Sequence, residues 1–196
     1  MDSALSFDPD LHIYRTGGVV LPSVTQVLAE MYDFKFVKPE VLKAAGEFGT
    51  AVHLVCELFD KNDLEYSSLD TALLPYLTAW KRFLSETSAS VLEIERRYHH
   101  KAMGFAGTID RLLEIDGKKV LVDIKTVSSL SPVVGIQLGA YERLILDNTE
   151  YTGLSRAAVQ LCANGTYKYR MYADPMDWAA FASLICLKNW RLKNAA

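Results

Sequence analysis

The sequence predicts an α/β protein in which helices flank a mixed central β-sheet. Helical periodicity dominates before residue 90, three consecutive strand patterns follow, and strands and helices then alternate to the end of the chain. With 196 residues, of which 50% are hydrophobic, the chain has the size and composition of one globular domain. We therefore expect a single domain over residues 1–196.

The first two predicted elements are a β-hairpin and a short helix. Residues 11–21 alternate around Thr16-Gly17-Gly18, a pattern typical of a hairpin. Ser23 and Gln26 then stand at the spacing of a capping box, in which two side chains satisfy free backbone amides at a helix start. We therefore expect a short helix to begin at this point.

Two longer helices are predicted next. Residues 39–60 favour a helix, although Gly46 and Gly49 weaken it and mark a candidate break where the backbone approaches another group closely. Apolar residues then recur with a helical period over residues 71–86, which predicts a helix with one buried face.

The pattern then changes to that of a β-meander. Residues 91–98, 105–115 and 119–126 favour strands, and Asp116-Gly117 between the last two is a strong hairpin signal. A helix over residues 132–146 follows.

The end of the chain predicts a second hairpin and a last helix. The strand patterns at residues 156–162 and 166–172 flank Ala163-Asn164-Gly165. Asp174-Pro175 caps a final helix that runs to about residue 192. This order of elements indicates a mixed sheet with helices on its faces.

Composition excludes several classes of protein. The formal net charge is −3, so any binding to nucleic acid must be local. The three cysteines stand far apart without a CxxC pair, which predicts reduced core thiols and no zinc or iron–sulfur site. No apolar run approaches the roughly 20 residues of a membrane span, and residues 1–10 do not resemble a signal peptide. We therefore expect a cytoplasmic protein without membrane association.

The sharpest chemical signal is an acid and an amine on one face of a predicted strand. Side chains alternate along a strand, so Asp123 and Lys125 share a face while Val122 and Ile124 take the other. Asp110 lies on the preceding strand, where antiparallel pairing can bring its carboxylate near Asp123. A divalent cation is a common way to hold two such carboxylates ionised, and the lysine suits stabilisation of charge on a phosphate oxygen. The alternative is an Asp–Lys ion pair that serves only the stability of the fold.

Two pairs of polar residues stand at i, i+4 spacing on predicted helices. His53 and Glu57 share a helix face, where they either reach a metal together or hydrogen-bond each other. Gln137 and Tyr141 repeat this spacing after the meander. They either bracket a substrate phosphate or base, or cap the edge of the core.

Four short motifs resemble those of the RecB-like branch of the PD-(D/E)XK nucleases. The resemblance reaches from about Leu11 to Tyr141, and residues 14–26 also look like that branch. In chain order the motifs are Gly49-Thr50-Ala51-Val52-His53, Gly107-Thr108-Ile109-Asp110, Asp123-Ile124-Lys125-Thr126 and Gln137-Leu138-Gly139-Ala140-Tyr141.

The resemblance implies a restriction-endonuclease-like core and metal-dependent hydrolysis of DNA phosphodiesters. One or two Mg²⁺ or Mn²⁺ ions are the implied cofactors. The implied ligands are His53, Asp110, Asp123 and the backbone carbonyl of Ile124, with Glu57 as a further candidate. Glu93 or Glu95 on the preceding strand could supply another carboxylate, or both form a solvated or pairing face.

Catalytic and DNA-contacting roles follow from the same resemblance. Lys125 would position or activate the attacking water beside Asp110 and Asp123. The implied DNA contacts are Gln137, Tyr141 and Thr126. Arg97 lies in the most basic short stretch of the chain, which is either a solvated loop or a further phosphate contact.

Departures from the family narrow the expected function. The cysteines that hold an iron–sulfur cluster in CRISPR-associated and AddB-type relatives have no counterpart, and the chain has no Walker loop for an ATP motor. The size and layout resemble stand-alone phage exonucleases. We therefore expect a deoxyribonuclease, an exonuclease on linear duplex or single-stranded DNA, that serves recombination, repair or phage replication in a bacterial or phage-infected cell.

The sequence leaves the mode of action open. A flap, junction or restriction-type endonuclease shares the same chemistry, and a catalytically silent module that binds DNA ends shares the fold. By analogy with lambda-type exonucleases, several copies of the chain could ring one DNA, and a single-strand-annealing or recombination protein is a candidate partner.

Overall fold

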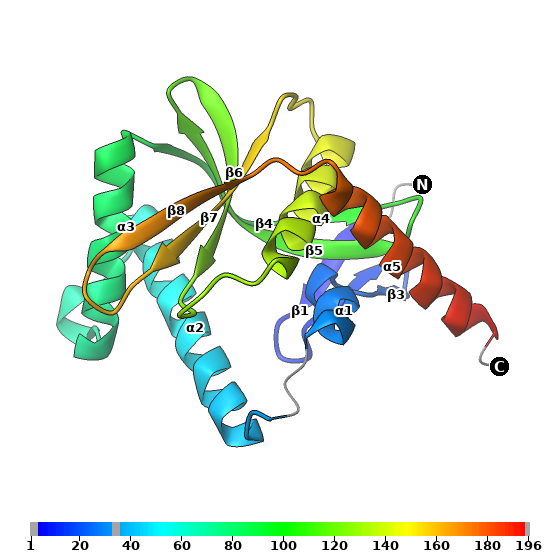
Figure 1. Ribbon diagram of the computed structural model, residues 1–196, viewed down its shortest axis with the longest axis horizontal. Coiled ribbons are helices and arrows are strands. Elements are labelled where there is room, and N and C mark those ends of the chain that lie inside the picture. The colour runs from blue at the N-terminus through cyan, green and yellow to red at the C-terminus, as the bar shows by residue number, and fades with distance from the viewer. Residues whose placement is uncertain (1–3, 33–35, 195–196) are drawn as a thin grey trace.

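The computed structural model describes residues 4–32 and 36–194, which form two β-sheets and their covering helices (Figure 1). The strands are β1 (Leu5–Asp8), β2 (Ile13–Thr16), β3 (Val19–Leu21), β4 (Ser90–His100), β5 (Phe105–Ile115), β6 (Lys118–Lys125), β7 (Ser155–Leu161) and β8 (Tyr167–Tyr172). The α-helices are α1 (Val24–Leu28), α2 (Pro39–Asp60), α3 (Leu74–Thr87), α4 (Val133–Asn148) and α5 (Met176–Asn194).

The larger sheet is mixed and confirms the predicted fold class. Its strand order is β4-β5-β6-β7-β8. Strands β6 and β7 pair in parallel, whereas the other neighbours are antiparallel. A parallel pair needs a crossover, and α4 supplies it between β6 and β7.

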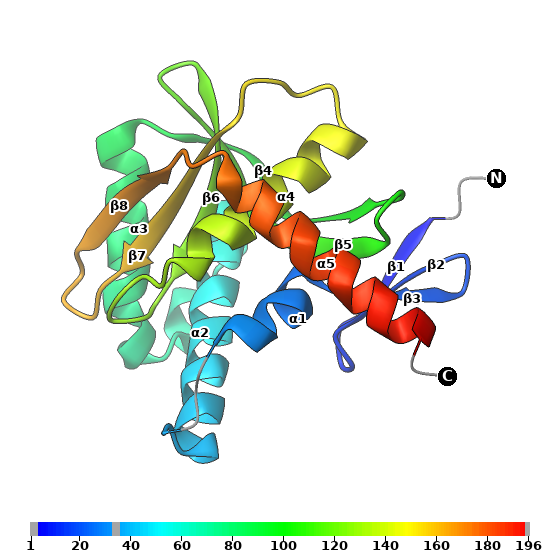
Figure 2. The ribbon, with the colours of Figure 1, turned by 45° about the vertical axis from the view of Figure 1, so that its right-hand side comes forward.

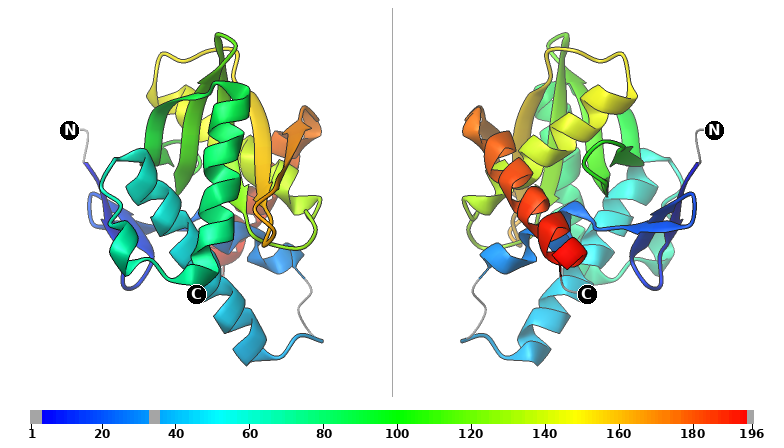
Figure 3. Two further views of the ribbon diagram at one scale, coloured as in Figure 1. Left: turned by 90° about the vertical axis from the view of Figure 1, so that its left-hand side faces the viewer. Right: turned by 90° about the vertical axis from the view of Figure 1, so that its right-hand side faces the viewer.

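Helices cover both faces of this sheet (Figures 1 and 3). Helices α2 and α3 bury Trp80 and Phe83 against β-strand residues such as Val122. Helices α1, α4 and α5 bury a second cluster on the opposite face, which includes Leu138 and Phe181. The sheet is therefore apolar on both sides, and charged side chains inside it require a specific reason.

The three N-terminal strands form a separate sheet, β1-β2-β3, that packs beside the ends of β4 and β5 (Figure 2). Tyr14 and Leu21 pack against Ala106, and Ser23 forms an isolated bridge with Ala106. Strand β1 was not predicted, because its four residues, which end beside Pro9, are too few for their alternation to mark a strand. The predicted capping box of α1 is present, with Ser23 and Gln26 bonded reciprocally.

Two expectations from the sequence are wrong. Helix α2 runs through Gly46 and Gly49 without a break, because the cost of two glycines is small beside a continuous ladder over 22 residues. The cysteines are not all core thiols, since Cys56 is buried while Cys162 is half-buried and Cys186 is exposed.

Within residues 4–32 and 36–194, no helix is long and apolar enough to cross a membrane.

Candidate active site

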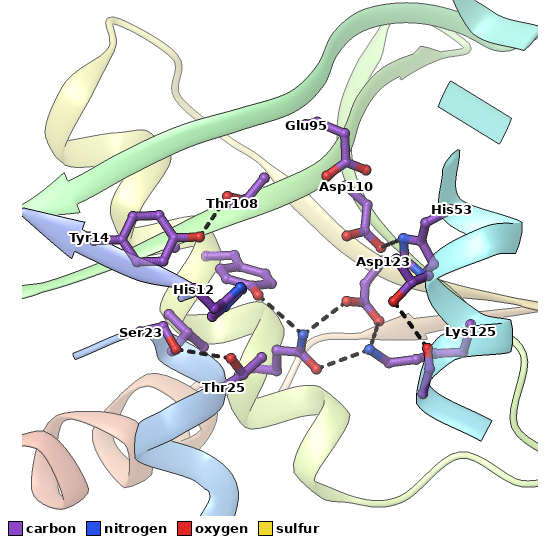
Figure 4. A pocket seen from close by; sticks show the side chains of 17 residues that line it. His12, Tyr14, Ser23, Thr25, His53, Glu95, Thr108, Asp110, Asp123 and Lys125 are labelled. Atoms are coloured by element: carbon purple, nitrogen blue, oxygen red, sulfur yellow. Dashed lines mark hydrogen bonds and ion pairs between the residues drawn. The ribbon is translucent and has the colours of Figure 1, made fainter. Parts of the chain in front are cut away.

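A cleft of about 600 Å³ gathers most of the predicted site residues (Figure 4). It lies where α2, the N-terminal sheet and strands β4, β5 and β6 meet. One side carries the titratable residues His53, Glu95, Asp110, Asp123 and Lys125. The other side carries the ring and hydroxyl groups of His12, Tyr14, Ser23, Thr25 and Thr108.

The charged side opens where β5 and β6 stop pairing through their backbones. Their register runs from Ile115–Lys118 to Arg111–Val122. One residue further, the Asp110 carboxylate accepts a hydrogen bond from the Ile124 amide at 2.7 Å. A side chain thus replaces the backbone acceptor, which fixes the Asp110 carboxylate in the opening between the strands.

His53 reaches this opening from helix α2. Its Nε2 atom lies 3.0 Å from the Ile124 carbonyl oxygen, and its Nδ1 atom lies 3.6 Å from Asp110 Oδ2. Gly49 precedes His53 by one turn, and a Cβ atom at Gly49 would stand 3.6 Å from Thr126 Oγ1. Helix α2 therefore lies against the end of β6, at a separation where the methyl group of an alanine at position 49 would make an ordinary van der Waals contact.

Glu95 is the third member of a cluster with His53 and Asp110. Each of the three side chains offers a ligand atom, and these atoms all lie within 4.8 Å of one another. Glu95 has a left-handed backbone, with φ of 47°, although it lies inside β4 between the Ile94–Arg111 and Arg96–Ile109 pairs. This conformation costs roughly 1–2 kcal/mol for a residue with a Cβ atom. Burial, and then the nearby Asp110 carboxylate, raise the pKa of Glu95 to about 7.

The structure separates the two glutamates that the sequence left undecided. Glu93 accepts a hydrogen bond from the Tyr98 hydroxyl at 2.6 Å and is not among the residues that line the cleft. Only Glu95 of the two lies beside His53 and Asp110.

Asp123, Lys125 and Gln137 form a connected polar group on the cleft floor. Lys125 Nζ lies 2.7 Å from Asp123 Oδ2 and donates to Gln137 Oε1 at 3.1 Å. The Gln137 amide nitrogen donates to Asp123 Oδ1 at 3.1 Å. Only one orientation of the amide satisfies a lysine donor and a carboxylate acceptor together, so these neighbours fix it.

The protonation of this pair follows from its surroundings. Burial raises the pKa of Asp123 to about 6, with Lys125 opposing the shift and Asp110 adding to it. Burial alone would lower the pKa of Lys125, but the carboxylates of Asp123 and Asp110 outweigh burial and raise it. Lys125 is therefore an ammonium at neutral pH, suited to stabilise negative charge and unsuited to accept a proton.

Tyr141 packs under the same group. Gln137 donates to its hydroxyl at 3.3 Å, and burial raises the pKa of Tyr141 well above its ordinary value. A Cβ atom at Gly107 would lie 2.8 Å from Tyr141 Cε1, closer than real contacts allow. The glycine of the second motif is thus needed for the tyrosine of the fourth to fit.

Besides Ile124, whose carbonyl oxygen meets His53, three predicted site residues lie outside the lining of the cleft. Glu57 forms an ion pair with Lys61 at 2.5 Å, one turn along α2. Arg97 lies within strand β4 and not in a loop as expected, and its guanidinium lies 4.6 Å from the ring centre of Phe7 in the N-terminal sheet. Thr126 follows β6 near Gly49. None of these three is among the cleft-lining residues, in contrast to Gln137 and Tyr141.

His12 also lines the cleft, and this position was not predicted from the sequence. His12 stands in the turn between β1 and β2 with φ of 50° and contacts Phe7 and Tyr14 edge-on. Its position depends on β1, which has no clear sequence signal. A histidine just before the strand that carries Tyr14 was the one available hint.

Comparisons with known proteins find distant structural likeness. No family model and no curated protein matches the chain. The structure of LHK-Exo in complex with dAMP is 14% identical, covers 88% of each chain and has a TM-score of 0.44. Another structure, an alkaline exonuclease (LHK-Exo) from Laribacter hongkongensis, is 15% identical, covers 88% of this chain and 91% of that chain, and has a TM-score of 0.41.

A third structure, SSO0001, is 19% identical, covers 74% of this chain and 75% of that chain, and has a TM-score of 0.36.

Proposed function

We propose that the chain is a divalent-metal-dependent deoxyribonuclease that hydrolyses phosphodiester bonds. One observation carries the proposal: His53, Glu95 and Asp110 offer clustered ligand atoms directly beside the ion pair of buried Asp123 and half-buried Lys125, in one open cleft. A merely structural ion pair needs neither the imidazole nor the two further carboxylates. Groups for holding a cation and for stabilising anionic oxygen stand together here.

The donor set fits Mn²⁺ or Mg²⁺. Two neighbouring ligands of an octahedral ion with bonds of about 2.1 Å lie about 3.0 Å apart, and opposite ligands about 4.2 Å apart. His53 Nε2 and the Ile124 carbonyl oxygen are 3.0 Å apart, and the clustered side-chain atoms lie within 4.8 Å of one another. Small side-chain rotations therefore suffice for binding. The proposed ligands are His53, Glu95, Asp110, Asp123 and the Ile124 carbonyl.

The bound ion would polarise the phosphate and lower the pKa of the attacking water. The remaining chemistry belongs to side chains of the cleft. Lys125 carries its positive charge to the point where negative charge develops on the phosphate, because Asp123 and Asp110 keep it protonated. Gln137 holds Lys125 and Asp123 at a fixed separation. Asp110 is held in turn by the Ile124 amide.

The opposite side of the cleft is suited to a polar, largely uncharged part of the substrate. Tyr14 and Thr108 share a hydrogen bond of 2.7 Å, and Ser23 and Thr25 share one of 3.0 Å. Such hydroxyls, with the His12 ring, can contact sugar oxygens or base edges. We place the DNA strand across this side, next to Gln137 and Tyr141, with Thr126 and Arg97 as contacts outside the cleft.

We further propose that the enzyme is an exonuclease on linear DNA, because the motif order and chain size resemble the stand-alone phage enzymes. Action within DNA recombination, repair or phage replication in a bacterial or phage-infected cytoplasm follows from that resemblance. On the same ground we propose a single-strand-annealing or recombination protein as a partner, and the assembly of several copies of the chain around DNA. An endonuclease of flap, junction or restriction type is the alternative with the same site, and a silent DNA-end-binding module is the alternative without turnover.

One gel assay tests the proposal. End-labelled linear duplex, linear single strand and closed circular DNA are each incubated with Mg²⁺, Mn²⁺ or EDTA, with Lys125→Ala as the inactive control. Metal-dependent loss of both linear substrates with circles spared is the result expected of an exonuclease, and the label position gives its direction. Nicked circles would favour the endonuclease, and DNA binding without any product would favour the silent module.

A further inference from the structure

A buried arginine lies directly behind the proposed metal ligands. Arg111 is fully buried on β5, next to Asp110 in sequence. Its Nη1 atom donates to Glu95 Oε1 at 3.0 Å and to the Asp110 carbonyl oxygen at 2.6 Å. The guanidinium thus touches one proposed ligand through its side chain and a second through its backbone.

The arginine is itself held from the other side. Its Nε atom donates to Asp60 Oδ2 at 2.6 Å, and the Asp60 side chain is also fully buried. The second Asp60 oxygen accepts a hydrogen bond from Trp80 Nε1 at 2.8 Å. Asp60 is the last residue of α2, the helix that carries His53. Helix α2 therefore contributes at two points, with His53 in the cleft and Asp60 behind it.

This contact accounts for the unusual backbone of Glu95. The pairs on either side place Glu95 opposite Asp110 and Ile94 opposite Arg111. In a regular strand, Glu95 would share the face of Asp110, and Arg111 would lie on the other face. The left-handed conformation of Glu95, with φ of 47°, lets one carboxylate reach Arg111 and the cluster with His53 and Asp110 together.

We propose that Arg111, fixed by Asp60, is a positioning residue that holds Glu95 in place to bind the divalent cation. The proposal rests on the proposed function of the cleft. One carboxylate oxygen of Glu95 accepts from Arg111, which leaves the other oxygen for the ion. Stability alone explains the arrangement poorly, because burying an arginine with two acids costs about as much desolvation as the ion pairs return.

The test compares Mn²⁺ affinity, measured by titration calorimetry, in Arg111→Lys, Asp60→Asn and Glu95→Gln. A lysine cannot bridge Asp60 and Glu95 as the planar guanidinium does. Asp60→Asn keeps the size of the side chain and an oxygen that accepts from Trp80, but its amide nitrogen then faces Arg111 Nε, so the variant removes both the charge and the hydrogen bond that fix Arg111. Arg156→Lys is the matched control, since Arg156 is also buried between two acids, Glu142 and Asp177, away from the cleft.

We expect Arg111→Lys and Asp60→Asn to weaken Mn²⁺ binding about tenfold or more, as loss of a partner behind a metal ligand does. The Mn²⁺ concentration for half-maximal cleavage should rise in parallel, and saturating Mn²⁺ should restore most of the rate. Arg156→Lys should lower the melting temperature without changing the Mn²⁺ affinity. In a Glu95→Gln background, Asp60→Asn should cause no further loss of affinity, because both changes act through one carboxylate.

Three results would overturn the inference. Unchanged Mn²⁺ affinity in folded Arg111→Lys and Asp60→Asn, with weak binding in Glu95→Gln, would make Arg111 structural and leave the nuclease proposal intact. Unchanged affinity in Glu95→Gln, with loss in Asp110→Asn, would remove Glu95 from the ligands and also leave the nuclease intact. A parent protein that neither binds Mn²⁺ nor cleaves DNA would remove both proposals.

Discussion

Replacing Lys125 by alanine should abolish most DNA cleavage while leaving the metal bound. The ammonium lies at the cleft, 2.7 Å from Asp123 Oδ2 and 3.1 Å from Gln137 Oε1. Its contacts are with polar groups of the site, and its side chain is 22% exposed at the cleft. Its removal should therefore leave the fold intact and act on the reaction.

The expected magnitude follows from the electrostatics of the cleft. A unit negative charge that develops about 4 Å from an ammonium is stabilised by about 4 kcal/mol at an effective dielectric constant of about 20. Because about 1.4 kcal/mol corresponds to a factor of ten, kcat should fall roughly a thousandfold. This value lies at the upper end of the cost of removing one oxyanion donor. Mn²⁺ affinity should not fall, since the variant removes a competing positive charge.

Single-turnover cleavage of end-labelled linear duplex, run beside calorimetric Mn²⁺ titration, measures both quantities. Lys118→Ala is the matched control, because Lys118 begins the same strand at its exposed end. The control should cleave at the parental rate. Parental cleavage by Lys125→Ala would refute the reasoning, because the ammonium would then not act on the charge of the reaction.

Three further predictions concern the metal and the packing around it. Asp123→Ala should lose Mn²⁺ affinity together with activity, and unchanged binding by calorimetry would remove Asp123 from the ligands. Because the pKa of Glu95 is about 7, this carboxyl is mostly protonated at pH 6 and ionised at pH 8, so Mn²⁺ affinity should fall about tenfold on going from pH 8 to pH 6. Glu95→Gln should reduce that change to about twofold, because Asp123, with a pKa of about 6, still becomes half protonated at pH 6. Gly107→Ala should destabilise the fold by about 1–3 kcal/mol in urea unfolding, because the new methyl would displace Tyr141, and an unchanged midpoint would contradict the close approach.

Much of the fold could be predicted because its elements carry strong local patterns. Strand β5 occupies residues 105–115 and helix α2 occupies residues 39–60, as the sequence predicts. A long segment whose apolar residues recur with one period is compatible with only one type of secondary structure. Strand β1 could not be predicted, because a four-residue strand depends on its pairing with β2 and not on its own pattern.

The candidate site was likewise predictable only where a local sequence pattern places its residues. Asp123 and Lys125 could be placed together because side chains alternate along one strand. The choice of Glu95 over Glu93 could not be made, because it depends on a left-handed residue within β4. The contact between Arg111 and Asp60 could not be predicted either, because Asp60 stands 51 residues earlier and meets Arg111 only after α2 has packed on the sheet.

The backbone amide and carbonyl of Ile124 can report on the state of the site in a spectroscopic measurement. The amide donates to Asp110 and the carbonyl lies against His53, so both sides of one buried residue contact proposed ligands. When Asp110 is protonated or shares its electrons with a cation, the Ile124 amide loses part of its hydrogen-bond strength. Its nitrogen and proton chemical shifts should therefore follow the loading of the cleft, and its solvent exchange rate should follow the opening of the strand end, without any attached label.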